Sequence, residues 1–344
     1  MHKYSCEFGL GVYCSYKTII PVEELETMKK SKRYHIYSIL STAKISIDKD
    51  DINIGSKGVS FNLIKHCGEH DEKFEIQEVD ILGLGFDYQF VKISTKYPYQ
   101  KMKIEVDKTY LLQFYEANIK GKYQMNKSQI LEYKNISIDS QRLFYNFYTG
   151  EKPNNEMQVL YVGQAFGLNG ERTALDRLKS HEKLQKILID CNSKYPHKRI
   201  YILLMQMNTQ IFSGFNGISK EFMRSEEESD KHLNDVMSSL PKEKQIINIT
   251  EDAIINYFKP EYNTNFVNNF PSVKHKGYSQ YYDLDYNSIT VELDMTFDHT
   301  PYLQLYTDEN RLDTLFETIK YNLFNDPNRS DMNDIFEKNN IVTK

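Results

Sequence analysis

A change in hydrophobic pattern near residue 140 is the feature of this sequence that most constrains its fold. Before it, apolar residues such as Met102, Ile104 and Val106 alternate with charged ones, which is typical of half-buried strands. After it, apolar strands are interrupted by segments with helical spacing. We therefore expect an α+β, multi-domain chain, with a mostly β domain over 1–138, a compact α/β sandwich over 139–270 and an acidic, aromatic extension over 271–344.

The second region predicts the element order β-β-α-β-α around a small mixed sheet. Two strands joined by a short polar loop suggest an antiparallel hairpin, and the later elements alternate helix and strand. The acidic run Glu226–Asp230 is interpreted as a surface loop, and a further helix is expected within 308–324. The five segments are QRLFYNFYT, MQVLYVG, a basic helix at about 173–190, RIYILLMQM and a helix at about 249–258.

Composition excludes some classes of protein. A net charge of −5 argues against a chain coated in positive charge, although a local basic face would suffice for nucleic-acid binding. No stretch approaches the roughly 20 apolar residues of a membrane span. The first residues lack the apolar run of a signal peptide, and four cysteines make no disulfide framework. We expect a cytoplasmic protein without a membrane association.

The basic helix carries an arginine on its apolar side. At 100° per residue, Arg177 lies with Leu178 and His181, whereas the lysines point to the opposite side. A guanidinium in such a place either extends to a surface carboxylate or lines a cleft. Residues 171–199 hold eight basic and four acidic residues, a stripe that suits either a solvated helix or a polyanion.

The helix at 249–258 presents the opposite anomaly. Asn248 can cap this helix, with Glu251 completing a capping box three residues later. Glu251 also shares a face with Ile254 and Phe258, so its carboxylate is expected at the edge of the apolar interface. It is either a cap residue or a functional acid.

Three of these segments, VLYVGQAF, DRLKSH and EDAIINYFKPEYN, together resemble the GIY-YIG nuclease family over about 140–268. Tyr161-Val162-Gly163 is similar to the second signature triplet of that family. Asn146-Phe147-Tyr148 stands where the first triplet is expected, with Asn146 and Phe147 in place of its glycine and isoleucine and Tyr145 as a rival tyrosine. The resemblance also covers Arg177 and His181, and Glu251 followed by Pro260 and Asn263. Arg172 competes with Arg177 for the role of the family arginine.

This resemblance implies a metal-dependent endonuclease that hydrolyses phosphodiester bonds in DNA, of the restriction or phage-defence kind. Glu251 would hold Mg²⁺ or Mn²⁺, Arg177 would neutralise phosphoryl oxygens and Tyr148 would be the general base. Tyr161 would orient the water or phosphate, and His181 would assist the base. The residues expected at the nucleic acid are Arg172, Lys179, Lys183, Lys186 and Asn263, the last of which also anchors its loop.

Two alternatives stay open. Because the first triplet is degenerate, the domain could be a catalytically inactive module that binds nucleic acid or protein. Tyrosine, with a pKa near ~10, is a poor base without help, and most of the 26 tyrosines are expected to be packing residues. The region 1–138 would serve target recognition or assembly, through a homo-oligomer or a partner protein.

A cluster in the first region also fits metal-binding chemistry. His66, Cys67 and His70 stand close together in KHCGEH and could complete a zinc site with Cys6 or Cys14. No paired C-x-x-C spacing accompanies them, so we interpret the cluster as a turn with a buried thiol.

Overall fold

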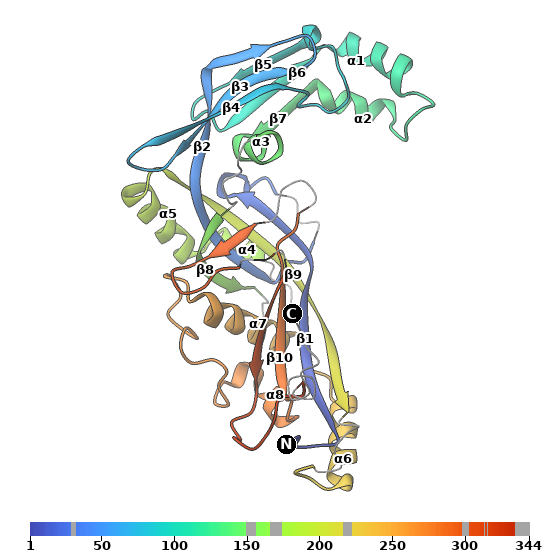
Figure 1. The fold of residues 1–344 in the computed structure, drawn as a ribbon, viewed down its shortest axis with the longest axis vertical. Helices are drawn as coiled ribbons and strands as arrows, with labels where there is room; N and C mark the ends of the chain where they lie inside the picture. Colours follow the sequence, from blue (N-terminus) through green and yellow to red (C-terminus); the bar gives the residue numbers. More distant parts are fainter. Residues whose placement is uncertain are drawn as a thin grey trace.

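The protein is described by a computed structural model, which covers residues 1–28, 32–148, 156–165, 174–215, 222–297, 303–312, 314 and 316–333. Within these residues it is a mixed α/β structure with a large curled mixed sheet and a small antiparallel sheet. The molecule is elongated, and the large sheet runs along most of its length (Figure 1).

Strands from both ends of the chain build the large sheet. Its order is β11-β8-β2-β9-β1-β10-β12, with β3 and β4 added beside the far half of β2. The neighbours are antiparallel except for β1 with β10 and β11 with β8, which are parallel. The strands on this path are β1 (Cys6–Pro21), β2 (Ile36–Ile54), β8 (Glu156–Gln164), β9 (Lys198–Phe215), β10 (Ser288–Asp294), β11 (Gln304–Tyr306) and β12 (Phe316–Asn322).

Helices cover both faces of the centre of this sheet. For this reason the first residues of β2 are apolar without alternation, as expected of a strand buried on two sides. Ile36 and Leu40 join the core beneath α7 (Glu243–Phe258), while Tyr37 and Ile39 join the core beneath α4 (Ala174–Leu178) and α5 (Glu182–Lys194). The end of β8 is thus reached by helices from both faces.

Residues 45–148 form a separate body, called here the inserted lobe. β2 enters it without a break and pairs there with β3 (Val59–His66), which pairs in turn with β4 (Asp71–Val79). The lobe has its own apolar core. Its other elements are β5 (Val91–Thr95), β6 (Lys101–Val106), β7 (Asn135–Asp139), α1 (Lys108–Phe114), α2 (Lys127–Leu131) and α3 (Ser140–Phe147).

The prediction of a hairpin at the start of the second region is wrong. Residues 141–147 of the segment QRLFYNFYT lie in the helix α3, which is capped by the Asp139 side chain, an acceptor for the Gln141 N–H. Leu143 and Phe144 pack into the lobe core because they share one face of that helix. The antiparallel partner of MQVLYVG, which is β8 as predicted, is therefore β2.

Other elements were predicted with mixed success. RIYILLMQM is part of β9 and Met102–Val106 part of β6, as expected. The basic helix is broken into α4 and α5, and the helix carrying Glu251 begins at Glu243, so Asn248 is no cap. The acidic run, expected in a loop, is in α6 (Glu226–Ser238). The segment 308–324, expected to be a helix, contains the strand β12 instead, and the described residues also include the helix α8 (Ser279–Asp283).

The boundaries predicted at 138 and 270 do not coincide with the sheet. β1 and β2 precede the first boundary and β10 follows the second, yet all three lie in the same sheet as β8 and β9. The compact unit of the predicted second region therefore also contains strands from the first and third regions.

Candidate functional site at the end of β8

Tyr37 lies at the centre of the candidate site. It stands directly opposite Gly163 in the antiparallel pairing of β2 with β8. A Cβ atom on Gly163 would lie 2.6 Å from both Cζ and the hydroxyl oxygen of Tyr37. Glycine is required here because a buried, rigid ring crosses the neighbouring backbone.

His181 joins this tyrosine from the other side. Its Nε2 atom is 3.1 Å from the Tyr37 hydroxyl, and its Nδ1 atom accepts a hydrogen bond of 3.3 Å from the Leu184 N–H as the cap of α5. A neutral imidazole that accepts at Nδ1 carries its proton on Nε2. His181 therefore donates to the Tyr37 oxygen and leaves the Tyr37 O–H able to donate elsewhere.

Tyr161 is the next group in this chain. Its ring centroid is 6.2 Å from that of Tyr37 and 5.3 Å from that of His181. Burial raises the pKa of Tyr161 and the Glu251 carboxylate raises it further, while Arg177 and a hydrogen bond from Tyr37 oppose the rise. Burial also raises the pKa of Tyr37. Tyr161 is half-buried, whereas Tyr37 is fully buried.

Gln164, the last residue of β8, links the charged groups. Its carbonyl oxygen accepts a hydrogen bond from Nη1 of Arg177, and its side-chain amide donates to Asn248 on α7 at 2.6 Å. Burial raises the pKa of Glu251 to about 7, against the lowering effects of hydrogen bonds from Gln164 and of the Arg177 charge. The Arg177 guanidinium and the Glu251 carboxyl group, which come from opposite faces of the sheet, thus both interact with Gln164.

Asp252, the residue after Glu251 in α7, is an unusual buried acid. It is 1% exposed, and burial together with the adjacent Glu251 raises its pKa to about 8. Its Oδ2 atom lies 3.7 Å from Nδ1 of His275, too far for a hydrogen bond. Neither atom has a hydrogen-bond partner among the residues that the structure describes. α7 therefore carries a fully buried acid next to the half-buried Glu251.

The segment after α7 holds β8 in place. The Asn263 side chain accepts from the Val162 N–H and donates to the Val162 carbonyl, both at 2.9 Å. The Tyr262 N–H donates to the Leu160 carbonyl at 3.1 Å. The Asn263 amide is thus engaged with the backbone of β8. This agrees with its predicted anchoring role, and it leaves the amide on the strand instead of directing it toward a nucleic acid.

Tyr148 does not reach this site. Its ring packs in the inserted lobe, 5.0 Å from Phe74 and 5.3 Å from Phe144 between centroids. Its rival Tyr145 is also in the lobe core, where its hydroxyl accepts a hydrogen bond from Gln141. The tyrosine that lies beside Tyr161 is instead Tyr37, because the strand paired with β8 comes from before the lobe.

The predicted nucleic-acid residues differ in their contacts. Lys179 is exposed and forms an ion pair of 3.3 Å with Glu26, and Lys186 lies 6.0 Å from the ring centroid of Tyr262. Lys183 is half-buried. All three follow Arg177 along α4 and α5. Arg172 lies outside the described residues.

Sequence reasoning missed Tyr37 and Gln164. Ile36-Tyr37 stands in an apolar run and was the signal for Tyr37. The first tyrosine was expected one hairpin upstream of Tyr161, which excluded this position. Nothing in the sequence distinguishes Gln164, whose role depends on contacts with α4 and α7.

Comparison of the chain with protein-family models, with curated proteins and with solved structures finds no match. In the part of the chain that the structure describes, every helix is too short or too polar to cross a membrane. The site geometry is therefore the basis for any statement about function.

Proposed function

We propose that this protein is a metal-dependent endonuclease of the GIY-YIG type that hydrolyses phosphodiester bonds in DNA. One observation carries the proposal. Two tyrosines, a histidine, an arginine and a glutamate converge on the end of β8 from separate elements; they are Tyr37, Tyr161, His181, Arg177 and Glu251. These are the residue types that the family uses.

The pairing of β2 with β8 adds support. His35-Ile36-Tyr37 supplies the isoleucine and tyrosine of the first signature triplet, with His35 in place of its glycine. Its Tyr37 lies opposite Gly163, the last residue of Tyr161-Val162-Gly163, on the neighbouring antiparallel strand. On this assignment the inserted lobe stands between the two triplets.

The hydrogen-bond chain selects Tyr161 as the general base. His181 donates to Tyr37, and the hydrogen bond from Tyr37 lowers the pKa of Tyr161, as does the Arg177 charge, against the rise that burial and Glu251 cause. Tyr161 is also half-buried, so a water can approach it more readily than it can approach Tyr37. Tyr37 and His181 are then positioning residues.

Arg177 supplies fixed positive charge next to this base. Its contact with the Gln164 carbonyl holds the guanidinium beside β8 and leaves further N–H groups of its fork for phosphoryl oxygens. A charge held in place before the reaction stabilises the developing negative charge without a reorganisation cost.

Glu251 fits the single carboxylate that Mg²⁺ or Mn²⁺ would need. The pKa of about 7 reflects a desolvated carboxyl group whose negative charge is incompletely compensated by protein groups, and a bound cation would compensate it. When bound, the ion would neutralise charge on the phosphoryl group and the leaving oxygen. One carboxylate is sufficient because Mg²⁺ retains several waters.

The basic residues after Arg177 supply positive charge for DNA binding at this site. We propose that Lys179, Lys183 and Lys186, with Arg172, contact the phosphate backbone, and that the inserted lobe contributes target recognition. We also propose a cytoplasmic role in restriction or phage defence. Assembly into a homo-oligomer, or with a partner protein, stays a prediction.

A plasmid-nicking assay tests the proposal. Purified full-length protein is incubated with supercoiled DNA and Mg²⁺, with and without chelator, beside Glu251→Gln and Arg177→Ala. We expect nicking that chelator and Glu251→Gln abolish. Arg177→Ala should lower the rate by about 10²-fold or more while DNA affinity changes only a few-fold, because its main contribution is to the transition state.

The matched control is Glu243→Gln, which removes an acid at the exposed start of the same helix and should leave nicking intact. DNA binding without cleavage by the wild-type protein, on every substrate and metal tried, would instead favour the inactive binding module. Cleavage that persists in Glu251→Gln would reject the assignment of the site.

A further inference from the structure

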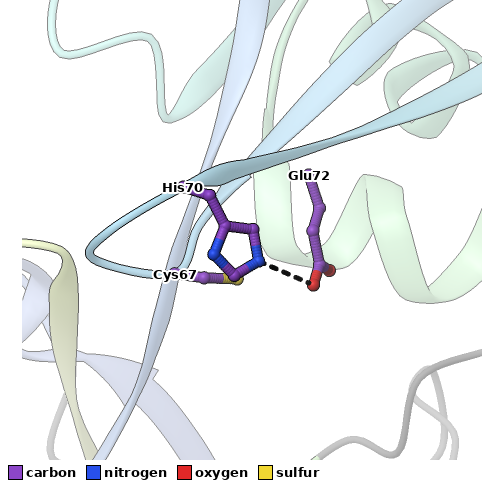
Figure 2. A group of neighbouring side chains, drawn as sticks. All are labelled: Cys67, His70 and Glu72. Carbon is purple, nitrogen blue, oxygen red and sulfur yellow. Dashed lines mark ion pairs between the residues drawn. The ribbon is translucent and has the colours of Figure 1, made fainter.

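The tip of the β3–β4 hairpin gathers three metal-ligating side chains that the proposed nuclease site does not use. Cys67 follows β3, His70 lies in the turn and Glu72 lies on β4. The thiol, imidazole and carboxylate ligand atoms lie within 4.8 Å of one another. Figure 2 shows the three side chains on one side of the hairpin, with an ion pair of 3.7 Å between His70 and Glu72.

The turn itself creates this arrangement. The Cys67 N–H donates to the His70 carbonyl at 3.0 Å, which closes the loop. Gly68 has a φ of +95°, a backbone conformation that residues with a side chain rarely adopt. The ligand groups are therefore brought together by the backbone of a short turn, in the spacing Cys-x-x-His-x-Glu.

The neighbouring histidine has other partners. His66 lies 2.8 Å from the Ser46 hydroxyl through Nε2 and 2.9 Å from Asp71 through Nδ1. Both of its ring nitrogens are engaged, so it is no ligand in this cluster. Cys6 and Cys14, which the sequence offered as partners, lie on β1 in the large sheet. The structure replaces these candidates with Glu72.

A histidine from outside the lobe lies beside this turn. The imidazole of His197, just before β9, lies against Gly68: a Cβ atom there would be 3.3 Å from Nδ1 and 3.5 Å from Nε2. His197 and Cys67 also line the same cavity, of about 260 Å³, together with Lys65. Lys65 lies 3.5 Å from Glu72 and offsets part of the negative charge of the group.

We propose that Cys67, His70, Glu72 and His197 bind a Zn²⁺ ion that fastens the inserted lobe to the start of β9. A thiolate with two imidazoles and a carboxylate is a donor set suited to tetrahedral Zn²⁺ and poorly suited to Mg²⁺. Ligands from two parts of the fold would fix the angle at which the lobe meets the large sheet. The site is independent of Glu251 and of nuclease activity.

Cobalt titration provides the test. Full-length protein is freed of metal with chelator and titrated with Co²⁺, which reports a thiolate ligand through a charge-transfer band in the near ultraviolet. We expect the thiolate band to saturate at one equivalent of Co²⁺, Zn²⁺ to abolish it, and Cys67→Ser to lose it. Cys14→Ser and His66→Ala are the controls, since neither side chain is in the site, and both should keep the band.

His197→Ala tests the link between the two bodies. It should weaken Zn²⁺ binding by about 10-fold or more, since a tetrahedral structural site would lose one ligand. Unchanged affinity would overturn the link to β9. Absence of a thiolate–cobalt band in the wild-type protein, or its persistence in Cys67→Ser, would overturn the site itself. Neither readout depends on DNA cleavage.

Discussion

The centre of the large sheet and the inserted lobe both bury tyrosines, but in different surroundings. In the lobe, Tyr148 packs between Phe74 and Phe144. At the end of β8, Tyr37 is bonded to His181, and Tyr161 lies within electrostatic reach of Arg177 and Glu251. Tyr148 is thus an aromatic packing group in the lobe, whereas Tyr37 and Tyr161 belong to a polar network at the sheet centre.

The difference lies in how many elements meet. The lobe core is closed by consecutive elements of the chain that present apolar side chains to one another. The end of β8 is reached by helices from both sheet faces, so polar groups placed at the edges of two apolar cores come into contact there. Buried polar groups of this kind are costly unless they are paired or serve a function.

The largest expected effect tests the two classes of tyrosine directly. Tyr161→Phe should lower the rate of DNA nicking by about 10²- to 10⁴-fold, because it removes the proposed base. Tyr37→Phe should have a smaller effect, since it breaks only the relay from His181. Tyr148→Phe is the matched lobe variant and should retain the wild-type rate. Equal rates for Tyr161→Phe and Tyr148→Phe would remove the distinction.

An intermediate effect is expected from close packing at the sheet centre. Gly163→Ala would force the buried Tyr37 ring to move, which should cost about 1–3 kcal/mol of unfolding free energy and lower activity. Gly55→Ala in the lobe meets only an ordinary contact of 3.5 Å and should change stability by less than about 0.5 kcal/mol. Urea unfolding of both variants measures the difference. Equal losses would contradict it.

The smallest expected effect concerns the pH dependence of stability. The folded pKa values of Asp252 and Glu251 are raised, to about 8 and about 7. Between the unfolded and folded pKa values the folded state keeps protons that the unfolded state has lost. The unfolding free energy therefore falls as pH rises from about 4, up to about 7 for the contribution of Glu251 and up to about 8 for that of Asp252.

Asp252→Asn should flatten this decline, because asparagine stays neutral at every pH tested. Urea unfolding at pH 5 and pH 8, with chelator present to keep cations from Glu251, measures the slope. The variant should gain stability relative to wild type at pH 8 and match it more closely at pH 5. An unchanged slope would mean that Asp252 ionises as readily in the folded protein as in the unfolded one.

Parts of the fold and site could be predicted because their signals are local. β8 and β9 follow from short apolar runs, and β6 from strict alternation. Arg177 and Glu251 were found because each places a charge on an apolar face. The helix α3 was misread as a strand because its aromatic residues favour both structures, and the cap at Asp139 was overlooked.

The sequence by itself determined which residues could be buried and where most of the central strands run, since side-chain polarity and spacing are properties of the chain. Only the tertiary structure decided that β2 lies beside β8, that Tyr37 stands opposite Gly163, and that His197 faces the hairpin of the lobe. Strand pairing depends on the packing free energy of segments far apart in sequence, and an insertion as long as the lobe leaves no local trace of which strands will meet.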